Sequence, residues 1–194
     1  SKLKTKIDML YSKVDGNQRV FEGYGLTEAL AVNCMNTPKY HKNGSIGKPI
    51  PGCQVGIFDS NGQMLPAGEV GEIALKTEAM MLGYFKDDEG TKTAIRDGWL
   101  FTGDYGHVDE DGFVYFKSRV KRVVKVSGVA VFPSEVEKLI ESVPGVEKVA
   151  AFGVPDHQLQ SAIKICVVTN YLDKEEMKSK MREHNHNNNH YKNI

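Results

Sequence analysis

The first part of the chain alternates short apolar runs with turn signals, which is the pattern of a strand-rich unit. In residues 54–65, QVGIFDSNGQML, an Asn-Gly pair separates two apolar runs and predicts a hairpin. Residues 71–77, GEIALKT, alternate apolar and polar positions and predict a half-buried strand. Residues 108–119, VDEDGFVYFKSR, predict a second hairpin around Asp111-Gly112. Short strands at this spacing favour a small barrel or a distorted sheet.

After Arg119 the pattern becomes a mixture of strands and helices. Residues 123–132 give two β-rich runs broken at Ser127-Gly128, and Ser134 with Glu137 predicts a capping box that opens a helix ending at Pro144-Gly145. Two further strands are predicted at 146–154 and 161–169, and another helix from Leu172. These elements, in about 65 residues, predict a small α+β unit.

The predicted fold class is therefore α+β, with a β-rich unit first and a boundary near residues 118–122. Residues 1–19 carry a weaker helical pattern. Residues 184–194 are rich in Asn and His without apolar periodicity, and are predicted to be disordered. The histidines of this tail lack acidic or thiol partners, so a metal site there is not favoured.

Composition narrows the function classes. The 194 residues carry 25 basic and 25 acidic side chains, and a formal charge of zero gives no long-range attraction to nucleic acid. No apolar run approaches the roughly 20 residues of a transmembrane segment, and the first residues do not resemble a signal peptide. The three cysteines form no CxxC pattern. We expect reduced thiols and a cytoplasmic location, with peripheral membrane association left open.

The segment GYGLTE, residues 23–28, concentrates candidate chemistry. Glycines at 23 and 25 allow the backbone to approach a ligand closely. Thr27 can donate to a phosphate oxygen, Glu28 is an oxygen ligand of the kind that Mg²⁺ prefers, and Tyr24 offers a face for a base. A purely structural turn is the alternative.

Two further segments carry candidate residues. In GWLFTGDYG, Asp104 follows Thr102-Gly103 in a predicted turn, where its carboxylate can accept hydrogen bonds from a ribose diol. An Asx-turn is the alternative. Residues 117–125 contain five basic side chains, among them Arg119, placed to reach a nucleotide held between two units, and Lys121, placed at a hinge. A solvated face is the alternative there.

Together these motifs resemble the C-terminal part of the adenylate-forming superfamily, of the acyl- and aryl-CoA ligase type. The resemblance runs from about residue 19 to residue 169. It is carried, in order, by GYGLTE, GSIGKPIPG, GEVGEIALKTEAMMLGY, GWLFTGD, DGFVYFKSRVKRVVKVSG, FPSEVE and VAAFGVPD. Ser118 and the segment 156–162 depart from the pattern of most relatives.

The resemblance implies a role for each matching residue. Tyr24 and Gly25 would lie at adenine, Thr27 at phosphate and Glu28 at Mg²⁺. Asp104 and Arg119 would hold the ribose hydroxyls. Lys121 would be the hinge of a mobile lid, and Lys125 and Gly128 would approach the thiol in the second half-reaction.

The resemblance also implies domains, cofactors and partners. Residues 1–120 would be the C-terminal part of the large AMP-binding domain, and residues 121–183 a small, incomplete mobile domain. The implied cofactors are ATP or AMP, Mg²⁺ and coenzyme A. The implied partners are a carboxylic acid, with a fatty or aryl acid favoured over an amino acid, and the missing N-terminal part of the same enzyme.

The phosphate loop and the adenylation lysine of the family do not occur in this sequence, so we expect that it does not adenylate alone. Two other readings stay open. One is a non-catalytic nucleotide-binding or regulatory module, and the other is a structural interaction domain in which the motif residues serve as turns and surface.

Overall fold

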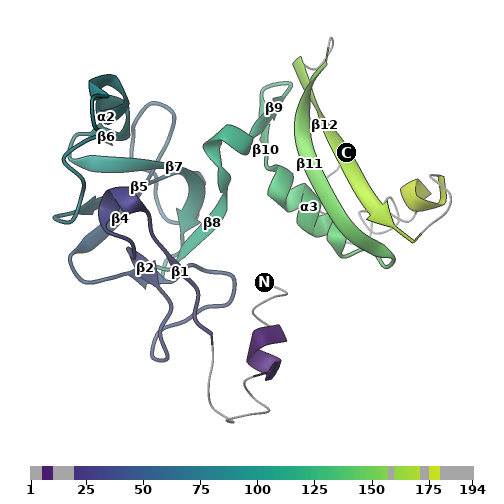
Figure 1. The fold of residues 1–194 in the computed structure, drawn as a ribbon, viewed down its shortest axis with the longest axis horizontal. Coiled ribbons are helices and arrows are strands. Elements are labelled where there is room, and N and C mark those ends of the chain that lie inside the picture. Colours follow the sequence, from purple (N-terminus) through teal and green to yellow (C-terminus); the bar gives the residue numbers. More distant parts are fainter. Residues whose placement is uncertain (1–5, 11–19, 157–159, 171–174, 180–194) are drawn as a thin grey trace. The chain divides into compact units, whose positions relative to one another are not determined.

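The computed structural model describes residues 6–10, 20–156, 160–170 and 175–179 of the chain. The chain divides into two compact units, Ser1–Phe116 and Lys117–Ile194, each of which is described here by itself (Figure 1). The architecture is strand-rich α+β with few helices, as the sequence predicts. Residues 6–10 are helical, whereas the rest of the helical pattern predicted up to residue 19 and the tail from residue 184 lie outside the described residues.

The first unit begins with a small antiparallel sheet that frames the GYGLTE segment. Its strands are β1 (Gly23–Tyr24), β2 (Cys34–Met35) and β3 (Lys48–Pro49), in the order β1-β2-β3. The 3₁₀ helix η1 (Thr27–Ala29) follows β1. Short strands of this kind contribute little by themselves, so the position of η1 depends on the packing beneath it.

A larger curled sheet forms the body of this unit (Figure 1). Its strands run in the order β4-β5-β7-β6, and β8 pairs with β7. Their bounds, with that of the one helix attached to them, are β4 (Cys53–Phe58), β5 (Gly71–Thr77), α2 (Asp88–Ala94), β6 (Ile95–Arg96), β7 (Trp99–Val108) and β8 (Val114–Arg119).

The prediction that residues 71–77 form a half-buried strand is wrong in one respect. They do form β5, but Ile73, Ala74 and Leu75 are each 0% exposed, so consecutive side chains on opposite faces are both buried. The cause is position. β5 lies between β4 and β7 in a curled sheet, and both of its faces are covered.

The two predicted turns form where expected. At Gly62 the amide donates to the carbonyl of Asp59 at 3.2 Å, although the returning chain makes only an isolated bridge between Phe58 and Met64. β4 pairs along its full length with β5 instead. The turn at Gly112, with φ of 81°, joins β7 to β8 and confirms the second hairpin.

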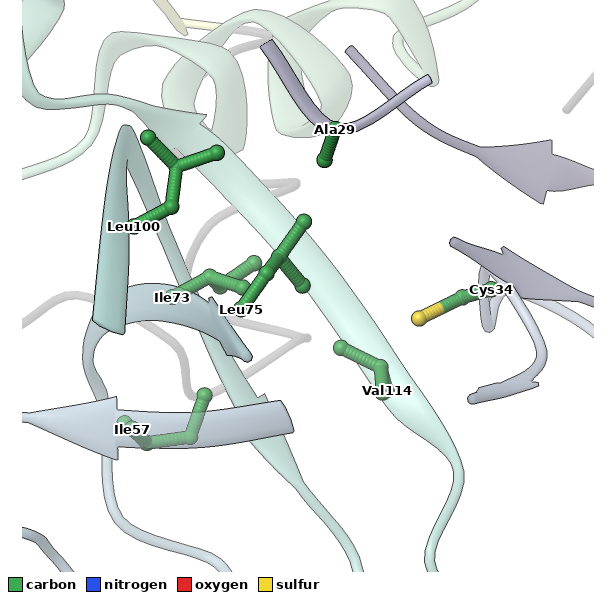
Figure 2. Close-up of a cluster of buried hydrophobic side chains, with 7 residues drawn as sticks. All are labelled: Ala29, Cys34, Ile57, Ile73, Leu75, Leu100 and Val114. Carbon is green, nitrogen blue, oxygen red and sulfur yellow. The ribbon is translucent and has the colours of Figure 1, made fainter. Parts of the chain in front are cut away.

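The core of the first unit is formed by side chains of η1, β2 and the curled sheet (Figure 2). Its buried members are Ala29, Cys34, Ile57, Ile73, Leu75, Leu100 and Val114. Burying one of the larger aliphatic side chains contributes about 1.5–3 kcal/mol. Because Ala29 belongs to this cluster, the core anchors the 3₁₀ turn that carries Thr27 and Glu28.

The second unit has the predicted order of two short β-rich runs, a helix and two strands, and the two short runs form an antiparallel hairpin. After η2 (Val120–Arg122) come β9 (Val124–Val126), β10 (Val129–Val131), α3 (Pro133–Glu141), β11 (Val146–Asp156) and β12 (Gln160–Thr169). β11 and β12 are antiparallel partners, and residues 175–179 are helical. Its buried core comprises Val136, Ile140, Val143, Ala151 and Met177.

The predicted capping box of α3 is absent. The N-cap residue is Phe132, without a side-chain cap, and Pro133 occupies the first helical position. The Ser134 hydroxyl instead donates to the Lys117 carbonyl at 2.8 Å, and the Glu137 carboxylate accepts from the Arg122 guanidinium at 2.8 Å. Both side chains therefore fasten α3 to the segment before it, which local spacing does not show. Among the described residues, no helix has the length and apolar character needed to cross a bilayer.

Candidate functional site

Two of the predicted nucleotide ligands meet in the first unit. The Tyr24 hydroxyl, on β1, donates to Asp104 Oδ2, on β7, at 2.7 Å across 80 residues of sequence. Asp104 is buried with 8% of its surface exposed, and Tyr24 is half-buried. A short bond between a hydroxyl and a largely buried carboxylate fixes both side chains.

Asp104 does not lie in a turn, contrary to the sequence prediction. It stands inside the long strand β7, at an irregularity in the β5–β7 pairing between Glu72 and Ala74. Gly103, with φ of 72°, allows the backbone to distort there, and its amide donates to Glu72 Oε1 at 3.0 Å. The strand irregularity, rather than a loop, presents the carboxylate.

The environment of Tyr24 keeps its hydroxyl protonated. Burial raises the pKa of Tyr24 well above its ordinary value, and the hydrogen bond and charge of Asp104 raise it further, while the Thr102 side chain acts in the opposite direction. Tyr24 is consequently a neutral hydrogen-bond donor throughout the physiological pH range.

The GYGLTE loop is folded against itself. A Cβ on Gly25 would lie 1.2 Å from the carbonyl oxygen of Ala31, so no larger residue fits there. Leu30 and Ala31 adopt positive φ angles of 54° and 73°, which is strained for residues with a side chain. The glycine is thus required by the packing of the chain on itself, and its contact with a nucleotide stays a prediction.

Glu28 is held by a neighbouring segment that the sequence reasoning missed. Its Oε1 accepts from the Tyr84 hydroxyl at 3.0 Å, and its carbonyl accepts from the Met81 amide at 2.7 Å. Tyr84 closes the GEVGEIALKTEAMMLGY motif, so its motif position was the available signal. Within the described part of the chain, no group of three or more His, Cys, Asp or Glu side chains could hold a metal alone. The predicted role of Glu28 at Mg²⁺ stays a prediction.

Thr27 lies in η1 of the first unit, and four further predicted residues lie on the surface of the second unit. Arg119 ends β8, Lys121 lies in η2, Lys125 in β9, and Gly128, with φ of 83°, at the tip of the β9–β10 hairpin. All four are exposed. Their predicted roles at ribose, hinge and thiol stay predictions.

A groove of about 470 Å³ in the second unit brings two of these residues together with the β11 strand. Lys121 and Lys125 line it beside Arg122, Phe152 and Gly153. Arg122 is paired with Glu137 on α3 at 2.8 Å, so the groove is partly neutralised.

Two family models match the chain. The AMP-binding enzyme model covers residues 3–85, and the AMP-binding enzyme C-terminal domain model covers residues 135–191.

Curated relatives cover most of the chain. A long-chain-fatty-acid–CoA ligase from Escherichia coli O6:H1 is 40% identical over 153 residues, which is 78% of this chain and 27% of that protein. A long-chain-fatty-acid–CoA ligase from Bacillus subtilis is 37% identical over 168 residues, or 86% of this chain and 30% of that protein. The chain thus spans less than a third of the length of these two relatives.

Solved structures share the fold. ATP-bound MatB from Rhodopseudomonas palustris aligns with a TM-score of 0.82 at 30% identity, over 93% of this chain and 37% of that one. The o-succinylbenzoate coenzyme A synthetase MenE from Bacillus subtilis, in complex with AMP, aligns with a TM-score of 0.76 at 28% identity, over 92% of this chain and 37% of that one.

Proposed function

We propose that this chain, which matches the AMP-binding enzyme model over residues 3–85 and the AMP-binding enzyme C-terminal domain model over residues 135–191, forms the adenosine-holding part and the lid of an ATP-dependent, AMP-forming acid–CoA ligase. In that reaction the oxygen of a carboxylate attacks the α-phosphorus of ATP and pyrophosphate leaves, which gives an acyl-adenylate. The thiol of coenzyme A then attacks the acyl carbon and AMP leaves, which gives a thioester.

The hydrogen bond between Tyr24 and Asp104 is the observation that carries this proposal. A carboxylate can accept several hydrogen bonds, so Asp104 would receive the ribose hydroxyls in addition to the bond from Tyr24. The same bond would hold the tyrosine ring at a fixed place for the adenine. Two residues that the motifs assign to one nucleoside are 2.7 Å apart, which supports their shared role.

In this proposal the phosphates of ATP would bind at η1. Thr27 would donate a hydrogen bond to a phosphate oxygen, and Glu28 would hold Mg²⁺ together with the phosphates of ATP. The ion supplies positive charge that stabilises the negative charge developing on the phosphoryl oxygens.

The second unit would act as the lid. In this proposal residues 1–120 belong to the large nucleotide-binding domain and residues 121–183 to the small domain, which turns about Lys121 between the two half-reactions. Arg119 would reach the ribose hydroxyls from the end of β8. Lys125 and Gly128 would approach the thiol of coenzyme A in the second half-reaction.

The acid substrate is proposed from the relatives. The two curated ligases described above are named for long-chain fatty acids, and the structural neighbour MenE is named for an aryl acid. A fatty acid is the first choice because the fatty-acid ligases have the higher identity to this chain, and an aryl acid the second.

The test is calorimetric binding of AMP and of 2′-deoxy-AMP to this chain. We expect the chain to prefer AMP by about tenfold, because one good hydrogen bond to a charged group is worth about 1.5–3 kcal/mol. Asp104→Asn should reduce this preference, whereas Glu110→Gln, at an exposed carboxylate of the β7–β8 hairpin, should leave it unchanged. Equal affinity of the unaltered chain for both nucleotides would contradict the proposal.

A further inference from the structure

Tyr84 contacts the one carboxylate that the proposed function assigns to a metal. Its hydroxyl donates to Glu28 Oε1 at 3.0 Å, although the two residues are 56 positions apart. The neighbouring Met81 amide donates to the Glu28 carbonyl at 2.7 Å. The segment before α2 therefore holds Glu28 at both its backbone and its side chain.

Tyr84 is itself held in place from the other side. Its amide donates to Thr91 Oγ1 at 2.9 Å, and that hydroxyl donates to the Asp87 carbonyl at 2.8 Å. The Asp87 carboxylate caps α2 by accepting from the Gly90 amide at 2.8 Å. A Cβ on Gly83 would lie 2.9 Å from Thr91 Cγ2, so the side chain of Thr91 fills the space beside the turn.

We propose that Tyr84 is a positioning residue for Glu28. The Tyr84 hydroxyl occupies one oxygen of the Glu28 carboxylate and leaves the other oxygen for a divalent cation. This inference rests on the proposed function, because the cation is the one that accompanies the substrate phosphates. It adds a residue from a different motif to the site, and the start of α2 would then support that residue.

The chemistry of the pair fits this role. Partial burial raises the pKa of Tyr84, and the hydrogen bond and charge of Glu28 raise it further, so the phenol stays a donor when the carboxylate is ionised. A glutamate side chain has several rotamers, and a fixed donor restricts them before the cation arrives. Loss of partners that orient metal ligands typically costs 10–100-fold in metal affinity. Because Tyr84 is 40% exposed, we expect its loss to reduce metal affinity by about tenfold, the low end of that range.

The test is Mn²⁺ binding to this chain, followed by electron paramagnetic resonance, with a non-hydrolysable ATP analogue at saturation. Tyr84→Phe removes only the hydroxyl and should weaken Mn²⁺ binding about tenfold. Tyr40→Phe is the matched control, because Tyr40 is also an exposed tyrosine and its ring faces the ammonium groups of Lys39 and Lys48, and it should leave binding unchanged. Glu28→Gln should weaken binding more than Tyr84→Phe does, and the double variant should bind as Glu28→Gln alone.

Thermal melting of each variant shows whether it is folded, and Thr91→Val, which removes the support of Tyr84 but not its hydroxyl, should weaken Mn²⁺ binding less than Tyr84→Phe.

The outcomes distinguish a failure of the positioning role of Tyr84 from a failure of the magnesium assignment of Glu28. If Glu28→Gln weakens Mn²⁺ binding and Tyr84→Phe binds like the unaltered chain, the positioning role is wrong while the proposed function stands. If Glu28→Gln itself binds Mn²⁺ as the unaltered chain does, the magnesium assignment in the proposed function fails first and the role of Tyr84 fails with it.

Discussion

Replacing Tyr24 by Phe tests whether the bond to Asp104 stabilises the first unit. The substitution keeps the ring and removes one hydroxyl, which donates at 2.7 Å to a carboxylate that is 8% exposed. A hydrogen bond to a charged group contributes about 1.5–3 kcal/mol, and a carboxylate that loses its donor keeps its desolvation penalty. Because Tyr24 is only half-buried, water can replace part of the bond, and we expect a loss of about 1.5 kcal/mol.

Urea unfolding followed by tryptophan fluorescence measures this change. The single tryptophan, Trp99, lies on β7 in the first unit, so it reports the part of the chain that Tyr24 belongs to. Tyr115→Phe is the control, because its hydroxyl also donates to an aspartate, but over 3.3 Å and to a more exposed partner, Asp109. We expect that control to lose at most about 0.5 kcal/mol, the weakest value of a net hydrogen bond.

The Tyr24→Phe variant should also change how stability depends on pH. The pKa of folded Tyr24 is raised, so its protonated form is favoured by folding. The corresponding stability is complete below the unfolded value of about 10 and is lost as the pH rises above it. The unaltered chain should therefore lose stability above about pH 10 more steeply than the Tyr24→Phe variant. If Tyr24→Phe is no less stable than the Tyr115→Phe control, the bond to Asp104 does not hold the two strands together.

Three other properties follow from the structure of the first unit and the exposed surface of the second. Leu75→Ala removes a fully buried side chain from the centre of the sheet and should cost about 2–5 kcal/mol in the free energy of urea unfolding; a loss below 1 kcal/mol would contradict its central position. Burial raises the pKa of the Cys34 thiol to about 12, so iodoacetamide at pH 8 should alkylate exposed Cys166 well before Cys34, as mass spectrometry of the peptides can check. Burial acts to raise the pKa of Asp109, but the hydrogen bonds from Lys42 and from further donors together outweigh it, so the pKa is lowered. The stability that ionised Asp109 contributes is present above its unfolded pKa of about 3.9 and is lost as the pH falls below that value. Lys42→Met should therefore flatten the dependence of unfolding free energy on pH at acid pH.

The order of elements was predictable because it depends on local periodicity. The strand-rich first part, the break at Ser127-Gly128 and the two strands after α3 all follow from apolar spacing and turn residues. The capping box at Ser134 was wrong because a local motif competes with longer-range partners, and here the Lys117 carbonyl takes the hydroxyl. A pattern of residues cannot show which distant group will claim a polar side chain.

In the candidate site, too, the sequence predicted which residues take part but not which distant groups they bond to. The motifs name Tyr24, Glu28 and Asp104 and assign Tyr24 and Asp104 to one nucleoside, but they do not show that these two side chains bond to each other or that Tyr84 bonds to Glu28. The placement of Asp104 in a turn failed because the distortion at Gly103 belongs to the pairing of β5 with β7, which is a property of the sheet.

The amino-acid sequence by itself determined the fold class, the succession of strands and helices and the identity of the motif residues, because these follow from neighbours a few positions away. Only the tertiary structure decided that Tyr24 bonds to Asp104 and that Tyr84 bonds to Glu28. Hydrogen bonds across 80 and 56 residues form when packing of a common core brings the strands and turns together, and no spacing along the chain encodes that geometry.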